Sequence, residues 1–340
     1  MAIPSGGEEF GVDELVSKLA GWVVLLCSFA TFAVMRKRWP CACFVVVMTL
    51  APEPGDAQFT DPRVYTNSPV DTNQVELLYA YARSNTSIDS SLIVGGAKFN
   101  LNSGIISYTR YFGLLHHLAW VEPSVPVAGL SGSITGTNIS GSVTGTGDSS
   151  YQFGVLLKGG PALSVSEFAN YKPTTSIGVS FTCTAPTGKY DPDKLLNLGT
   201  ARWSFKPEVG FSHPFGREQK WEIDAYANSY FFTENTEYHG VEILRQQPLP
   251  GFEGHLSYSF NNVVTASVDT RFALRGDTSV DGADQYSAQR VLLIGSEVNV
   301  SMNPHSTLVF VFAKAAVHQN GPNVGGFAVR YDYTWGKGYK

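Results

Sequence analysis

Charged residues and cysteines are scarce in this chain of 340 residues. Asp, Glu, Lys and Arg make up 16% of it, against roughly 25% in an average soluble domain. The net charge of -5 gives no bulk attraction to nucleic acid, so no nucleic-acid partner is expected. Four cysteines are too few for a disulfide scaffold. A mean hydropathy of -0.04 excludes a polytopic helical membrane protein.

Long apolar runs are confined to the first 50 residues. The run 19–34 follows acidic residues, whereas a secretory signal begins with a positively charged region. A second run, 41–50, follows the basic residues 36–38 and precedes the small residues Gly55 and Ala57. Positive charge, an apolar core and a small-residue cleavage site are the parts of a signal peptide in their usual order. We therefore predict a signal peptide over 35–57.

On this interpretation translation starts at Met35, and residues 1–34 are a non-native extension from a misplaced gene start. Cleavage before Gln58 would leave Cys183 as the one cysteine of the exported chain, so no internal disulfide is expected. The alternative is a membrane span over 19–35, at the lower limit of length for a transmembrane helix.

Alternating polarity replaces apolar runs after residue 58. In the segment 202–212 the odd positions are apolar and most even positions are polar or charged, and the segments 221–228, 264–272 and 329–335 repeat the pattern. This period of two is typical of β-strands with one apolar face. No apolar run of 18 residues remains, so no transmembrane helix is expected there.

A soluble antiparallel sheet with one wet face would show the same alternation. Three features favour a membrane barrel instead: aromatic residues at strand ends, an export signal, and long loops that alternate with short turns. The long loops are 186–200, 233–250 and 276–288, and the short turns are 214–219, 260–263 and 302–305.

The predicted fold class is therefore all-β: a transmembrane antiparallel β-barrel of about 12 strands over 74–340, after a periplasmic N-terminal segment at 58–73. Residues 166–172 predict a short periplasmic helical turn, and 128–149 a mobile outer loop rich in Ser, Thr and Gly. The strands are expected near 74–84, 103–113, 117–127, 150–160, 174–185, 200–213, 219–233, 250–261, 263–275, 288–300, 306–317 and 324–336.

Several long motifs follow one another in a fixed order. They are Gly160-Pro161-Ala162-Leu163, Glu167-Phe168 with Tyr171, Ala185-Pro186-Thr187-Gly188-Lys189-Tyr190-Asp191, Asn197-Leu198-Gly199, Arg202-Trp203-Ser204-Phe205-Lys206-Pro207-Glu208, Phe231-Phe232-Thr233-Glu234-Asn235-Thr236-Glu237-Tyr238, Gln247-Pro248-Leu249 and His255-Leu256-Ser257-Tyr258. Through them the chain, from about Gln74 to Trp335, resembles the outer-membrane transporters of the meta-pathway phenol-degradation family. The resemblance implies a barrel that passes aromatic compounds across the bacterial outer membrane.

Two departures from the family pattern stand out. Ala201 occupies a position where the family usually has Asn before Arg-Trp, and the chain ends Tyr339-Lys340, whereas such barrels typically finish on an aromatic residue.

Charged residues on the strands are expected to face the lumen, because Arg or Lys near the midplane of the lipid face costs about 2–4 kcal/mol. They form either a mixed-sign ladder that holds the interior together or the lining of a solute path. The lining set comprises Arg202, Lys206, Glu208, Glu222, Asp224, Asp269, Arg271, Arg330 and Asp332.

No catalytic site, metal site or cofactor is expected. Glu222 and Asp224 could pair as acid and base, but Arg202 and Lys206 on the preceding strand give a simpler account through neutralisation. Ser257 beside His255 lacks the nucleophile-elbow sequence of serine hydrolases.

The sequence predicts a non-enzymatic outer-membrane channel for passive uptake of small aromatic or hydrophobic solutes. Its expected partners are outer-membrane lipid, the barrel-assembly machinery and the solute. The alternative is a structural or surface-interaction barrel with a blocked lumen, in which loops 128–149 and 233–250 form the contact surface.

Overall fold

The computed structural model describes residues 60–85, 97–194 and 196–338. The predicted extension and signal peptide, over 1–57, lie outside the described residues. Within the described part, no helix is long and apolar enough to cross a membrane.

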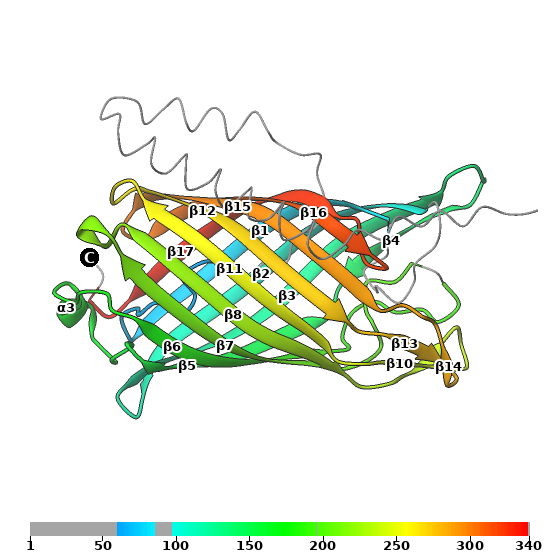
Figure 1. Ribbon diagram of the computed structural model, residues 1–340, viewed down its shortest axis with the longest axis horizontal. Coiled ribbons are helices and arrows are strands. Elements are labelled where there is room, and N and C mark those ends of the chain that lie inside the picture. Colours follow the sequence, from blue (N-terminus) through cyan, green and yellow to red (C-terminus); the bar gives the residue numbers. More distant parts are fainter. Residues whose placement is uncertain (1–59, 86–96, 195, 339–340) are drawn as a thin grey trace, which may run out of the picture. The chain divides into compact units, whose positions relative to one another are not determined.

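Twelve antiparallel strands form a closed barrel (Figure 1). The last strand, β17, pairs with the first, β1, and β2 pairs with β3, so the ring of twelve strands closes on itself, as lipid requires. The predicted fold class and strand number are confirmed. Around the barrel the strands are β1 (Thr72–Ser84), β2 (Ala97–Leu114), β3 (His117–Ile134), β5 (Ser149–Lys158), β6 (Ser176–Ala185), β7 (Ser204–Phe215), β8 (Trp221–Phe232), β11 (Leu249–Ser259), β12 (Val264–Arg275), β15 (Gln289–Asn303), β16 (Ser306–Gln319) and β17 (Gly325–Gly336).

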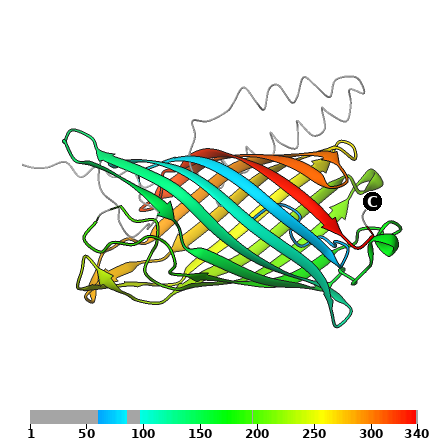
Figure 2. The same ribbon diagram turned by 180° about the vertical axis from the view of Figure 1, so that it is seen from behind.

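The two ends of the barrel differ in the length of their connections (Figures 1 and 2). One end carries short turns, the 3-10 turn η1 (Arg217–Gln219) and the helix α3 (Val165–Phe168). The other end carries the long connections. Short turns face the periplasm in outer-membrane barrels, so we name these the periplasmic end and the outer end.

The outer connections contain more strand than the sequence indicated. Residues 128–149 were expected to form a mobile loop, but β3 continues to Ile134 and pairs with β4 (Ser140–Thr146). Apolar residues such as Leu130 alternate with the serines and glycines here and pack with Phe99 and Leu198, which explains the extension. In loops 233–250 and 276–288, four short strands form a second sheet: β9 (Asn235–Tyr238), β10 (Glu242–Gln246), β13 (Thr278–Val280) and β14 (Ala283–Asp284).

The helical turn predicted at 166–172 is present as α3, which starts one residue earlier and ends at Phe168. A capping box explains the start: the Ser164 side chain accepts from the Glu167 backbone N–H, and the Ser164 backbone N–H donates to Glu167 Oε2 at 2.8 Å. Ser164 Oγ also donates to Glu167 Oε2 at 2.6 Å. These hydrogen bonds lower the pKa of the Glu167 carboxyl.

We expect the pKa of Glu167 to rise toward its ordinary value in Ser164→Ala, because the hydrogen bond from Ser164 Oγ to the Glu167 carboxylate is lost. A lowered carboxyl pKa means that the cap stabilises α3 above the ordinary pKa of Glu and loses this effect as the pH falls through the lowered value. NMR titration of the Glu167 carboxyl carbon measures the change. Ser166→Ala is the control, since Ser166 contacts Ser164 and has no hydrogen bond to Glu167.

A tight backbone contact organises the outer loop between β6 and β7. A Cβ on Gly199 would lie 2.7 Å from the backbone carbon and oxygen of Gly188, so both positions of the family motifs require glycine. Asp148 holds the same region, because its carboxylate accepts from the backbone N–H groups of Gly188 and Thr200 at 2.8 and 2.9 Å. The next residue, Ala201, has a φ of 53°.

Replacement of Ala201 by Gly or Asn is expected to raise the free energy of unfolding by about 1 kcal/mol, because an alanine in the left-handed region carries a Cβ clash that Gly avoids and Asn tolerates. This conformation also accounts for the Asn usual in the family. Equilibrium urea unfolding in lipid vesicles measures the effect. The matched control is Ala227→Gly within β8, where the same substitution should destabilise the barrel.

Candidate functional site: the barrel lumen

Side chains alternate between lipid and lumen along every strand of the barrel wall. On β7, Val209 and Phe211 are 53% and 38% exposed on the lipid face, whereas Glu208 is 2% exposed and Ser212 is fully buried on the lumen face. The orientation predicted for segment 202–212 is therefore the observed one. The lumen is the place where functional side chains converge.

Eight of the nine predicted lining residues lie on lumen-facing strand positions. The exception is Arg202, which precedes β7 at the outer mouth and donates from Nη2 to Gln246 Oε1 on β10 at 2.7 Å. The lumen-facing eight are Lys206, Glu208, Glu222, Asp224, Asp269, Arg271, Arg330 and Asp332.

Four further carboxylates and one histidine on neighbouring strands also face the lumen and were not among the predicted residues. They are Glu76, Glu122, Glu253, Glu297 and His255. Among the described residues of the twelve barrel strands, nine carboxylates thus occupy lumen-facing positions, against the four cations Lys206, Arg271, Arg275 and Arg330. The wall is predominantly acidic rather than evenly mixed.

Residues 60–71, which belong to the predicted periplasmic N-terminal segment 58–73, lie inside the lumen (Figure 2). We refer to 60–71 as the inner segment. It enters from the periplasmic end, where the Val70 N–H donates to Leu163 O at 2.8 Å. Its buried hydrogen bonds explain the placement, because these backbone and side-chain groups find partners on the barrel wall.

Tyr65 anchors the inner segment in a slot on the wall. Its ring lies against Gly210 and Gly178, where a Cβ would come within 1.9 and 2.5 Å of ring carbons. Its edges contact Tyr226 and Trp120, at centroid distances of 5.1 and 5.8 Å. Such aromatic pairs contribute about 0.5–1.5 kcal/mol each beyond burial. The two glycines therefore make room for a ring that is completely buried.

The polar atoms of Tyr65 are also satisfied by the wall. Its hydroxyl donates to Glu208 Oε1 and contacts Ser180 Oγ, both at 2.9 Å. Its carbonyl accepts from Ser176 Oγ at 2.6 Å. A buried phenol without these partners would cost free energy, so the hydrogen bonds fix the position of the ring.

Arg63 binds the acidic side of the wall. Its Nε donates to Ser257 Oγ at 2.8 Å and lies 3.5 Å from Glu222 Oε2, and its backbone N–H donates to Asp224 at 3.3 Å. The predicted Glu222–Asp224 pair thus meets a cation from the inner segment rather than from β7. Because Ser257 is engaged by Arg63 and His255 Nδ1 by Asp269 at 2.8 Å, these groups form a structural network.

The inner segment also reaches the opposite wall. Asp61 pairs with Arg330 on β17, which also bonds Asp332 at 2.8 Å. The strand that holds Tyr65, β7, is six strands from β17 in this barrel of twelve, so the two contacts lie across the lumen from each other. The segment therefore spans the lumen from one wall to the other.

One side of the lumen wall is apolar. On the contiguous strands β16, β17, β1 and β2, the lumen-facing positions in the row of Arg330 and outward of it are mostly apolar or small, including Leu78, Ala80, Ile105, Val309, Val311, Ala313 and Ala328. Their neighbours along the chain, such as Leu77 and Tyr79, are 48% and 47% exposed to lipid. The lumen thus has an acidic half that holds the inner segment and an apolar half that faces it.

The family model described as "Putative MetA-pathway of phenol degradation" matches residues 67–331. No protein of curated function matches the chain.

Solved structures are similar in fold. An outer membrane channel from Pseudomonas putida F1 is 19% identical, with a TM-score of 0.70, over 82% of this chain and 100% of that one. The transport unit of the autotransporter AIDA-I from Escherichia coli is 11% identical, with a TM-score of 0.49, over 86% and 97% of the two chains. The first likeness supports the barrel fold, and the second is too weak to carry an argument.

Proposed function

Because this chain belongs to the phenol-degradation family whose model covers 67–331, we propose that it is a passive channel of the bacterial outer membrane for small aromatic or hydrophobic solutes. The observation that carries the proposal is the apolar half of the lumen wall, over Leu78, Val311 and their neighbours. Apolar solutes gain free energy when they leave water for such a surface. We infer that the inner segment narrows the path in this state, because it contacts opposite walls of the lumen.

The inner segment across the lumen is the observation that favours the second candidate, a structural or surface-interaction barrel with a blocked lumen. Uptake of radiolabelled phenol into proteoliposomes distinguishes the two. A channel should equilibrate phenol faster than protein-free vesicles do, and faster than vesicles that contain an unrelated barrel. A rate equal to that of both controls would favour the blocked barrel, as would unchanged phenol uptake in a deletion strain.

The role of the charged lining is to hold the inner segment and to bias the ions that pass when it leaves. We expect the barrel without residues 60–70 to prefer cations, because nine lumen carboxylates outnumber four cations and a ring of one sign favours counter-ions. Reversal potentials in a KCl gradient measure the preference. The double variant Glu253→Gln, Glu297→Gln should reduce it, whereas Glu218→Gln at the periplasmic turn should not.

We further propose that the chain has no enzymatic role. The Glu222–Asp224 and His255–Asp269 groups are engaged in contacts that hold the lumen together.

A further inference from the structure

A row of cations and polar side chains crosses six neighbouring strands near the outer end of the barrel. Adjacent strands lie about 4.8 Å apart, which places Lys314 and Arg83, two strands apart, at a backbone separation of roughly 10 Å. The register passes in order through Lys314, Gly325, Arg83, Asn100, Ser131 and Ser142, on β16, β17, β1, β2, β3 and β4. We call this set the outer row.

The outer row faces away from the barrel axis. Arg83 and Lys314 are exposed, whereas their neighbours Ala82 and Ala313 are 2% exposed on the lumen side. The next outward-facing row toward the periplasm begins with Phe312, Phe327 and Tyr81. Aromatic side chains mark the interface between lipid and water. Lys314 and Arg83 therefore lie one step outward of the aromatic residues, at the level of the lipid headgroups, and face them sideways.

The charge of this surface has one sign. Among the described residues of these six strands, every Asp and Glu faces the lumen, namely Glu76, Glu122 and Asp332. Arg83 is held in place on the outward face, because its Nε donates to Tyr81 Oη at 3.0 Å. Lys98, opposite Ser133, adds a third cation one step farther out. The surface is complementary to an anionic headgroup.

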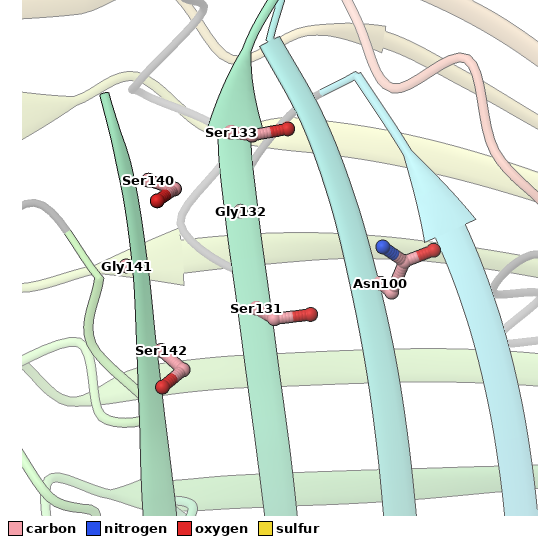
Figure 3. Close-up of a pocket in the computed structure, with 7 residues that line it drawn as sticks. All are labelled: Asn100, Ser131, Gly132, Ser133, Ser140, Gly141 and Ser142. Carbon is pink, nitrogen blue, oxygen red and sulfur yellow. The ribbon is translucent and has the colours of Figure 1, made fainter. Parts of the chain in front are cut away.

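Polar groups beside the cations form a hollow of about 390 Å³ on the hairpin of β3 and β4 (Figure 3). Its hydroxyls come from Ser131, Ser133, Ser140 and Ser142, and its amide from Asn100. The opposite face of this hairpin is filled, since a Cβ on Gly132 would lie 2.6 Å from the Phe99 ring. The hollow offers hydrogen-bond donors and acceptors in the plane of the sheet, as sugar hydroxyls require.

We propose that the outer row binds a phosphorylated glycolipid of the outer leaflet. Its phosphates lie against Arg83, Lys314 and Lys98, and its sugar hydroxyls lie against Asn100 and the serine hollow. A glycolipid headgroup carries both chemistries, and it is the molecule that borders the barrel at this height on the outer side. Basic residues near an anionic lipid surface each strengthen binding. This site is independent of solute passage through the lumen.

The test compares binding of two lipids to the purified full barrel in detergent. One is a chemically defined lipid A with two phosphates and inner-core sugars, and the other is its dephosphorylated form. The triple variant Arg83→Gln, Lys98→Gln, Lys314→Gln should lose affinity for the phosphorylated lipid by roughly tenfold or more, and both proteins should bind the dephosphorylated form weakly. Heat-modifiable migration on gels verifies that the variants are folded.

The matched control removes the same charge at the periplasmic end, with Lys158→Gln, Lys172→Gln and Arg217→Gln. It should keep the affinity of the original chain. Equal affinities for all three proteins, or equal binding of the two lipids, would overturn the proposal. So would a change in oligomer mass without a change in lipid affinity, since a second copy of the barrel would then be the occupant.

Discussion

Deletion of residues 60–70 is expected to raise single-channel conductance in planar bilayers by roughly tenfold or more, because a twelve-strand barrel is wider than the eight-strand type that side chains fill. The inner segment holds opposite walls together through Tyr65 on β7 and the Asp61–Arg330 pair on β17. Without the inner segment, water should fill the space between the acidic and apolar halves of the lumen and ions should pass through it. The original chain should show little conductance under the same conditions.

A point substitution on the barrel wall should also raise the single-channel conductance. In Gly210→Ala the new Cβ would lie 1.9 Å from Tyr65 Cδ2, so the ring must leave its slot. The control is Gly104→Ala, where the nearest atoms to a Cβ are 3.9 and 4.0 Å away, and its conductance should stay low. If the deletion leaves conductance unchanged, another part of the chain closes the lumen and the inner segment is not the plug.

The sequence alone predicts which side chains face the lumen and which face lipid on strands whose two faces differ in polarity. On β7 the alternation of charged and aromatic residues directly encodes lumen and lipid, because a period of two is a local property of the chain. β16 is different: Phe310 and Phe312 face lipid while Val309 and Val311 face the lumen, so both faces are apolar and the alternation disappears. For this reason the apolar half of the lumen could not be predicted from the sequence.

The inner segment was missed for another physical reason. Its position depends on contacts with residues that are distant in sequence, such as Glu208 at a separation of 143 and Arg330 at 269. No periodic pattern within 60–71 predicts contacts with such distant residues. Glu253 and His255 alternate with Phe252 and Leu256 on β11, so their lumen-facing orientation could have been predicted from the sequence. The glycines of that strand weaken the alternation.

Val311→Asn is expected to slow entry of phenol-sized apolar solutes by about tenfold, because each transfer past the site then desolvates an amide, and roughly 1.4 kcal/mol corresponds to this factor. Val311 lies at the edge of the apolar half. It is in register with Ala328 on β17, which pairs with Ala80 on β1, and on its other side with Glu297 on β15. Val311→Leu keeps the surface apolar and should retain uptake. Proteoliposome influx of labelled phenol measures both variants.

The matched control introduces the same amide at a position that already carries a polar side chain. Ser103 pairs with Ala80 in the same row of the wall, and Ser103→Asn should leave phenol influx unchanged. Ion conductance of the 60–70 deletion is measured with and without Val311→Asn. Because Val and Asn have similar volumes, the conductance should not change if the substitution alters only the polarity of the lumen wall and not the width of the lumen. A parallel fall in conductance would indicate a narrowed lumen. Normal influx through Val311→Asn would mean that apolar solutes do not follow this half of the wall, whereas loss of influx alone would identify it as their path.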